Sequence, residues 1–245
     1  NAVPVFVANA RFSAEGPAAL PKNACSQKPL LALPTYLARH DADWMTLREA
    51  GVPQEKLIVC GEMRIDLALR AARPRKTGEV PCLLGVGTGL DDERLLLEAY
   101  RRLAKDYPRL RLVLSPRAAK RAKALGAFVR AQGFTTEFHL SLAVLSARNA
   151  EVIVLENAAC LAEYYALAQA AYVGGALENG QGPEDLCEPV LHGVPVLCGP
   201  NVGEWRPFAQ QLDEAGALSF VQNAADIARV VAICISQAEI GRASC

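Results

Sequence analysis

The 245-residue sequence lacks the patterns that would place it across a membrane or on nucleic acid. Its purely apolar runs, such as Leu30–Leu33 and Val230–Ile235, fall far short of the roughly 18 residues that suggest a membrane span. Lysine plus arginine total 26 and aspartate plus glutamate total 26, so the formal net charge is zero and no overall basic field attracts nucleic acid. Any charged ligand therefore has to be bound by local groups.

Histidine is scarce and cysteine is dispersed along the chain. The three histidines, His40, His139 and His192, are not spaced to share a metal with a cysteine. The eight cysteines stand singly, without a C-x-x-C pair, and most lie in apolar stretches. These features favour buried thiols in a reducing compartment, and we expect neither a metal nor a cofactor.

What the sequence does contain is a regular alternation of strand-like and helix-like segments, which is typical of parallel α/β layers. The expected strands are 3–8, 36–38, 57–60, 82–84, 110–114, 152–155, 171–173, 194–197 and 217–221. The expected helices are 41–50, 91–107, 118–132, 160–170, 186–192, 205–214 and 224–235. This order predicts one complete doubly wound domain preceded by the tail of another, with ligands at the carboxyl ends of the strands.

One change of composition divides the chain. Residues 1–70 are expected to end a first domain, 71–79 to form a basic linker that contains one proline and one glycine, and 80–238 to form the second domain. The segment 239–245 has no apolar period, and we expect it to be a non-native tail. Because the chain opens on Asn1 just before an expected strand, we also expect an upstream piece.

A glycine-rich turn, Gly85–Gly89, follows an expected strand and precedes a helix, where a phosphate-binding loop would lie. Leu90 stands where a dinucleotide fingerprint needs its third glycine, and the Lys-Ser/Thr ending of a P-loop is absent. A tight turn is therefore an equally good interpretation, and Thr88 is kept as a possible ligand contact.

Three further features follow strand ends and suit an anionic nucleotide. Arg117 comes directly after an expected strand, where a guanidinium can pair with a phosphate. Gly174 and Gly175 follow another strand and allow the backbone to approach a ligand closely. Glu188, at the start of a short expected helix, can accept hydrogen bonds from both hydroxyls of a ribose.

The serial order of several segments resembles the 3-deoxy-D-manno-octulosonic acid (Kdo) transferases, which are inverting GT-B glycosyltransferases. The resemblance runs from Val3 to about Ile235. The segments that carry it are 3–13, 61–66, Pro116-Arg117, 173–177, Glu188-Pro189 and 195–200. It implies a GT-B fold, with a C-terminal Rossmann-like doubly wound domain and the tail of an N-terminal Rossmann-like domain.

The resemblance also implies a reaction, the transfer of Kdo from CMP-Kdo to a lipid A precursor without a cofactor. Arg117 and the amides near Gly174 and Gly175 would stabilise the departing CMP phosphate, and Glu188 would bind the ribose. Asn9, Arg11 and Arg64 are possible further contacts. The general base would lie in an upstream part, which would also attach the protein to the cytoplasmic side of the bacterial inner membrane. The present chain alone would then be inactive.

The chain departs from the family pattern where the donor would bind. It reads Gly87-Thr88-Gly89 where the family usually has Ser-Thr-His, and polar residues of the family are replaced at Ala118 and at 157–160. The segment 180–188 is longer than its family counterpart, so the loop 178–185 is altered. Two alternatives therefore stay open, a GT-B enzyme with another nucleotide-sugar donor and an inactive nucleotide-binding paralogue.

Overall fold

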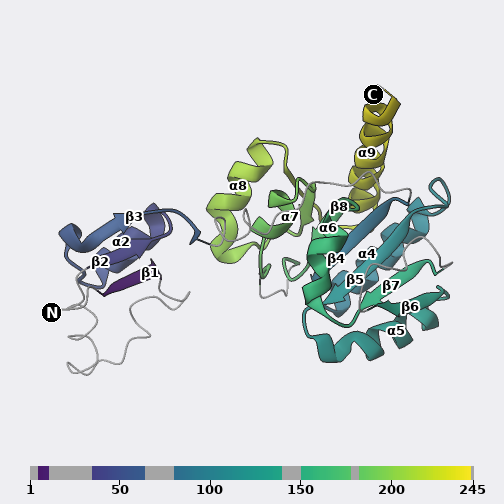
Figure 1. The fold of residues 1–245 in the computed structure, drawn as a ribbon, viewed down its shortest axis with the longest axis horizontal. Coiled ribbons are helices and arrows are strands. Elements are labelled where there is room, and N and C mark those ends of the chain that lie inside the picture. Colours follow the sequence, from purple (N-terminus) through teal and green to yellow (C-terminus); the bar gives the residue numbers. More distant parts are fainter. Residues whose placement is uncertain (1–4, 11–34, 64–79, 140–149, 178–181, 244–245) are drawn as a thin grey trace. The chain divides into compact units, whose positions relative to one another are not determined.

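The computed structural model describes residues 5–10, 35–63, 80–139, 150–177 and 182–243. The chain divides into two compact units, Asn1–Arg70 and Ala71–Cys245 (Figure 1). In the first unit, β1, β2 and β3 form a parallel three-stranded sheet in that order. Its elements are β1 (Phe6–Ala10), β2 (Thr35–Ala38), α2 (Asp41–Glu49) and β3 (Leu57–Val59).

The second unit is a seven-stranded parallel sheet in the order β10-β9-β8-β4-β5-β7-β6. Its elements are β4 (Cys82–Thr88), α4 (Leu90–Leu103), β5 (Arg111–Pro116), α5 (Ala122–Ala131), β6 (Thr136–His139), β7 (Val152–Leu155), α6 (Leu161–Tyr165), β8 (Ala168–Val173), α7 (Cys187–Leu191), β9 (Val196–Cys198), α8 (Arg206–Glu214), β10 (Leu218–Phe220) and α9 (Ala224–Ala243). The expected doubly wound α/β architecture is confirmed.

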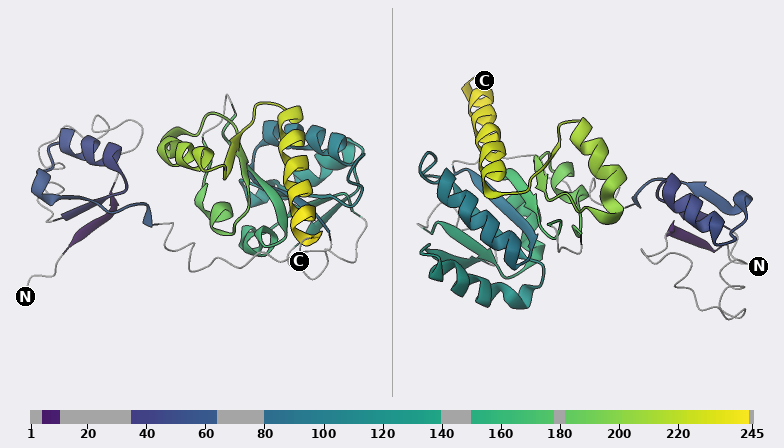
Figure 2. Two further views of the ribbon diagram at one scale, coloured as in Figure 1. Left: turned by 90° about the horizontal axis from the view of Figure 1, so that it is seen from above. Right: turned by 180° about the vertical axis from the view of Figure 1, so that it is seen from behind.

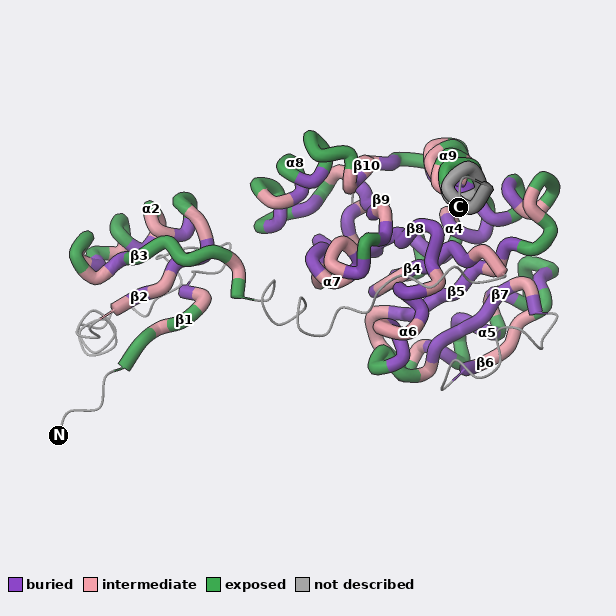
Figure 3. The backbone as a smooth tube through the Cα atoms, turned by 45° about the horizontal axis from the view of Figure 1, so that its top comes forward, coloured by how far each residue is buried: buried purple, intermediate pink, exposed green. Residues whose placement is uncertain are grey.

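Apolar layers cover both faces of this sheet, as parallel strands require. On one face, Leu83 and Leu112 pack with Tyr100 of α4, Val129 of α5 and Ile227 of α9. α9 packs beside α4 (Figure 2). On the other face, a second core contains Leu84, Val113, Tyr164 of α6 and Val194. The central strands are almost wholly buried (Figure 3).

The structure differs from the expected elements at one helix and contains one strand that was not expected. The expected helix 160–170 ends at Tyr165, and β8 begins at Ala168. Alanine favours helices, but β8 pairs with both β4 and β9, so tertiary packing overrides the local propensity. The edge strand β6 was not expected, because its short sequence TEFH has little apolar character.

The last helix also differs from expectation. It was expected to end at residue 235, but α9 continues to Ala243 and so includes most of the segment 239–245. Once a helix is nucleated, each further residue adds a hydrogen bond at little cost, so a segment without an apolar period can still continue it. Within the described residues, no helix has the length and apolar character needed to cross a membrane.

Candidate functional site at the carboxyl ends of β4, β5 and β8

The order of the larger sheet reverses at β4. From β4 the chain moves to β5 on one side and later returns to β8 on the other. Open α/β sheets bind ligands at such a reversal, beyond the carboxyl ends of the strands. The turns after β4 and β8 meet here, because Gly174 donates its amide to the Val86 carbonyl at 2.8 Å. We call the carboxyl ends of β4, β5 and β8 the switch point.

A buried carboxylate that the sequence analysis missed organises the switch point. Asp92, in the first turn of α4, is 4% exposed and accepts hydrogen bonds at Oδ2 from the amides of Gly89 at 2.9 Å and Gly175 at 3.0 Å. Its Oδ1 accepts a hydrogen bond from the Tyr172 hydroxyl at 2.8 Å. Burial raises the pKa of Tyr172, and Asp92 raises it further. The sequence signal was a capping pattern, with Asp92 three residues after the N-cap Gly89.

The backbone amides of the diglycine turn, Gly174-Gly175, are hydrogen-bonded inside the protein. Gly174 and Gly175 were expected to offer their amides to a phosphate, but these amides are donated to Val86 and to Asp92. A Cβ on Gly174 would lie 2.7 Å from the Gly87 carbonyl oxygen, so glycine is needed there for close packing of the two turns. In this structure, both amides therefore have partners within the chain.

Arg117 lies beside the diglycine turn. Its backbone amide bonds to the Thr88 carbonyl at 3.1 Å, which holds the end of β5 against the turn after β4. The guanidinium lies so close to Gly175 that a Cβ there would collide with Nη2. Nη2 donates to the Gly182 carbonyl, and Nε lies 3.2 Å from Oε1 of Glu184. The structure thus brings Arg117 and Gly175 together and adds Glu184, which the sequence analysis did not single out.

Glu188 lies in the first turn of α7 and is half-buried. Burial raises its pKa, the neighbouring Asp185 raises it further, and a hydrogen bond from the Tyr165 hydroxyl at 3.5 Å opposes both. Asp185 accepts from the amides of Cys187 at 2.6 Å and Glu188 at 3.3 Å, and so caps α7. This places Glu188 on the helix that directly follows the segment contacting Arg117.

Thr88 was a possible ligand contact, but its side chain is fully buried. Its hydroxyl donates to Oε1 of Glu93 at 3.3 Å, so the residue acts within the core. Arg121 binds the same carboxylate through two hydrogen bonds of 2.9 Å each. Burial raises the pKa of Glu93, while Arg121 lowers it. Arg121 is therefore the counter-ion of a buried glutamate.

The first unit holds one described candidate, Asn9. Its backbone has φ of 55° at an irregularity in the β1 and β2 pairing, and its buried Oδ1 accepts no hydrogen bond. Strain and an unsatisfied polar atom at a strand end often mark functional positions. Arg11 and Arg64 lie outside the described residues. Nearby, Arg39 is buried and pairs with Asp43 at 2.7 Å and Glu62 at 3.4 Å.

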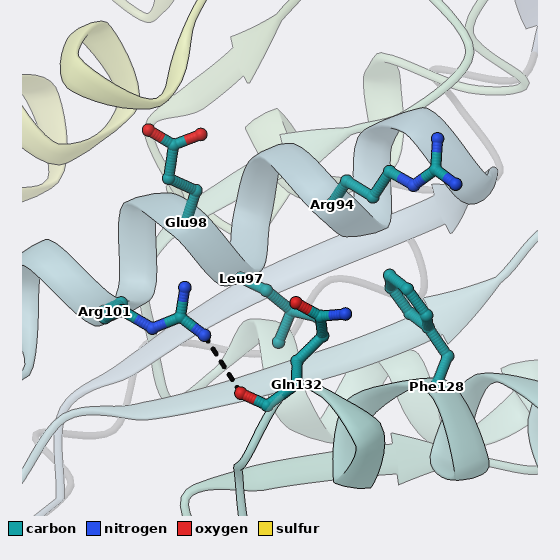
Figure 4. Close-up of a pocket in the computed structure, with 6 residues that line it drawn as sticks. All are labelled: Arg94, Leu97, Glu98, Arg101, Phe128 and Gln132. Carbon is teal, nitrogen blue, oxygen red and sulfur yellow. Dashed lines mark hydrogen bonds between the residues drawn. The ribbon is translucent and has the colours of Figure 1, made fainter.

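A separate groove of about 400 Å³ lies between α4 and α5 (Figure 4). Its lining residues are Arg94, Leu97, Glu98, Arg101, Phe128 and Gln132. Arg101 closes one side by donating to the Gln132 carbonyl at 2.9 Å. None of the expected site residues lines this groove. Among the residues described, no cluster of three or more His, Cys, Asp or Glu side chains could hold a metal.

The fold is that of the GT-B glycosyltransferases and of epimerases that share it. The C-terminal CMP-Kdo binding domain of WaaA from Acinetobacter baumannii matches with a TM-score of 0.56 and 19% identity, covering 73% of this chain and 93% of that one. The UDP-GlcNAc 2-epimerase from Methanocaldococcus jannaschii matches with a TM-score of 0.60 and 14% identity, covering 96% of this chain and 63% of that one. No protein-family profile matches the chain.

Sequence comparison confirms the resemblance to the Kdo transferases. The 3-deoxy-D-manno-octulosonic acid transferase of Aquifex aeolicus is 27% identical over 173 residues, which cover 71% of this chain and 46% of that protein. The transferase of the same name from Haemophilus influenzae is 25% identical over 233 residues, covering 91% of this chain and 54% of that protein. The chain thus spans about half the length of these relatives.

Proposed function

We propose that this chain contains the donor-binding part of an inverting glycosyltransferase that moves Kdo from CMP-Kdo to a lipid A precursor. The observation that carries the proposal is the position of Arg117 over Gly175 at the switch point, in a chain similar to the Kdo transferases. A guanidinium at that edge suits a nucleotide phosphate. The proposed setting is the cytoplasmic side of the inner membrane.

The proposed chemistry uses charge stabilisation without a metal. The acceptor hydroxyl attacks the anomeric carbon, the bond from that carbon to the CMP phosphate oxygen breaks, and the phosphate gains negative charge. Arg117 faces this charge and stabilises it, while Glu188 accepts hydrogen bonds from the ribose hydroxyls. The base that takes the acceptor proton belongs to the expected upstream part, so the chain by itself would bind a donor without transferring the sugar.

Calorimetric titration of CMP and of UMP into the 245-residue chain tests the proposal. We expect CMP to bind more tightly than UMP, and Arg117→Ala to weaken CMP binding by about one to two decades, because a hydrogen bond to a charged group is lost. Arg102→Ala, which removes an exposed charge on α4, should leave the affinity unchanged. If neither nucleotide binds, the proposal fails.

The two alternatives give different results in the same titration. A GT-B enzyme with a UDP-sugar donor would bind UMP as well as or better than CMP, and the fold shared with a UDP-GlcNAc epimerase favours testing it. An inactive paralogue is favoured by the internal use of the Gly174 and Gly175 amides and by the Arg117–Glu184 ion pair. It would bind CMP and show no transfer when the upstream part is supplied.

A further inference from the structure

The carboxylate of Glu184 lies where a ligand anion is expected. Oε1 is 3.2 Å from Arg117 Nε, and Oε2 would be 3.5 Å from a Cβ on Gly87. The carboxylate therefore lies between the end of β5 and the turn after β4, at the switch point. Its side chain is 58% exposed, so the interior does not force it into this position.

Hydrogen bonds on both sides of Glu184 hold it at Arg117. Gly182 donates its amide to the Gly175 carbonyl at 2.8 Å and accepts from Arg117 through its own carbonyl. Pro183 restricts φ between Gly182 and Glu184. Asp185 caps α7 through the amides of Cys187 and Glu188. Because both flanking segments are anchored, the Arg117–Glu184 pair is a defined contact of the fold.

The charges around this pair are predominantly negative. Asp92 is bonded to Gly175, Glu184 contacts Arg117, and Asp185 and Glu188 follow within the same segment. The nearby Arg121 is bound by both oxygens of Glu93. An incoming anion therefore meets a guanidinium that a carboxylate already neutralises, and it gains most if it takes the place of that carboxylate.

We propose that Glu184 is the resident counter-ion of Arg117 and determines how much negative charge the ligand phosphate can carry. The inference rests on the proposed nucleotide site. A phosphodiester, which carries one negative charge, replaces the Glu184 carboxylate without changing the charge held by Arg117. A nucleoside diphosphate brings additional negative charge into surroundings that already contain several carboxylates, and like charges repel at these distances. Glu184 thus selects sugar donors built on a nucleoside monophosphate.

The test titrates the methyl ester of CMP, CMP and CDP into the wild-type chain and into Glu184→Gln. Removing the carboxylate should raise the affinity for all three ligands. The gain for CDP should exceed the gain for the singly charged ester by about tenfold, because the Glu184 carboxylate repels a ligand with more negative charge more strongly. Glu184→Asp keeps the charge and should retain the wild-type order. Glu214→Gln, an exposed change at the end of α8, is the matched control and should alter none of the affinities.

The outcomes separate this inference from the proposed function. If wild-type chain binds CMP in an Arg117-dependent way and Glu184→Gln changes nothing, the inference is wrong and the nucleotide site stands. Equal gains for all three ligands would also overturn it, since charge selection would be missing. If no nucleotide binds to either protein, both fail. Circular dichroism of each variant checks that it is folded.

Discussion

Asp92 and Tyr172 are 80 positions apart in sequence, yet the tyrosine hydroxyl donates to the aspartate at 2.8 Å in the interior. The other oxygen of Asp92 holds the amides of Gly89 and Gly175. One carboxylate thus joins the start of α4, β8 and the diglycine turn. Buried polar groups that lose a partner cost considerable free energy, so this contact fixes the spacing of the turns beside which Arg117 lies.

The first prediction concerns this contact. Asp92→Ala leaves three donors without an acceptor and should lower the free energy of unfolding by about 3 kcal/mol or more, while Tyr172→Phe should lower it by about 1 kcal/mol. Urea denaturation of both single variants and the double variant measures the coupling. The effects should be non-additive, because both changes remove the same bond. Asp91→Ala, at an exposed neighbour, should stay within about 0.5 kcal/mol of wild type.

The second prediction concerns the buried ion pair. Arg121→Ala leaves the fully buried Glu93 carboxylate without its bidentate partner and should destabilise the chain by roughly 3 kcal/mol. The adjacent Lys120→Ala removes an exposed charge and should change stability by less than about 0.5 kcal/mol. Adding Glu93→Gln to Arg121→Ala should recover part of the loss. Equal effects of the two single substitutions in denaturant titration would contradict the assignment.

The third prediction concerns close packing of the turns. A Cβ on Gly174 would lie 2.7 Å from the Gly87 carbonyl oxygen and 2.8 Å from Asp92 Oδ2, so Gly174→Ala forces backbone to move and should cost about 3 kcal/mol. At Gly89 the nearest atom to an added Cβ is 3.5 Å away, and Gly89→Ala should cost about 1 kcal/mol or less. Chemical denaturation of the two variants compares them directly. A smaller loss for Gly174→Ala than for Gly89→Ala would refute the packing argument.

The fourth prediction concerns Glu188 and pH. Its pKa is raised in the fold above the ordinary value of 4.5, mainly by burial, so the fold favours the protonated form. The stabilisation of the fold that comes from protonated Glu188 is present at low pH, and it is lost as the pH rises through the raised pKa of this carboxyl group. Glu188→Gln imitates the protonated form, so its melting temperature should exceed that of wild type at pH 7, and the difference should vanish near pH 4.

The same variant should bind CMP about tenfold less tightly at pH 7, because the neutral amide is a weaker acceptor for the ribose hydroxyls than a carboxylate is. Scanning calorimetry measures the melting temperature and titration calorimetry measures the CMP affinity, both on one preparation of the variant. A stabilised variant with unchanged affinity would mean that Glu188 does not contact the nucleotide. Glu163→Gln, a change on the half-buried side of α6, serves as the control.

The strands and helices that carry strong apolar patterns could be predicted from the sequence. Val152–Leu155 is a continuous apolar run, and β7 has these bounds. For residues 168–170 the local sequence predicts a helix, because the neighbours that make them part of a central strand lie elsewhere in the chain. Apolar periodicity reports burial of a segment, but it does not identify the partner that buries it.

The α/β class, the resemblance to the Kdo transferases and the placement of Arg117 and the diglycine at strand ends follow from the sequence alone, because these depend on local pattern and motif order. How the site residues are used depends on the tertiary structure. It directs the Gly175 amide to Asp92, buries Thr88 and pairs Arg117 with Glu184. Each of these outcomes depends on which groups from distant segments come within hydrogen-bond distance, about 3 Å, of one another. These distances follow from the packing of the whole sheet and not from the local sequence.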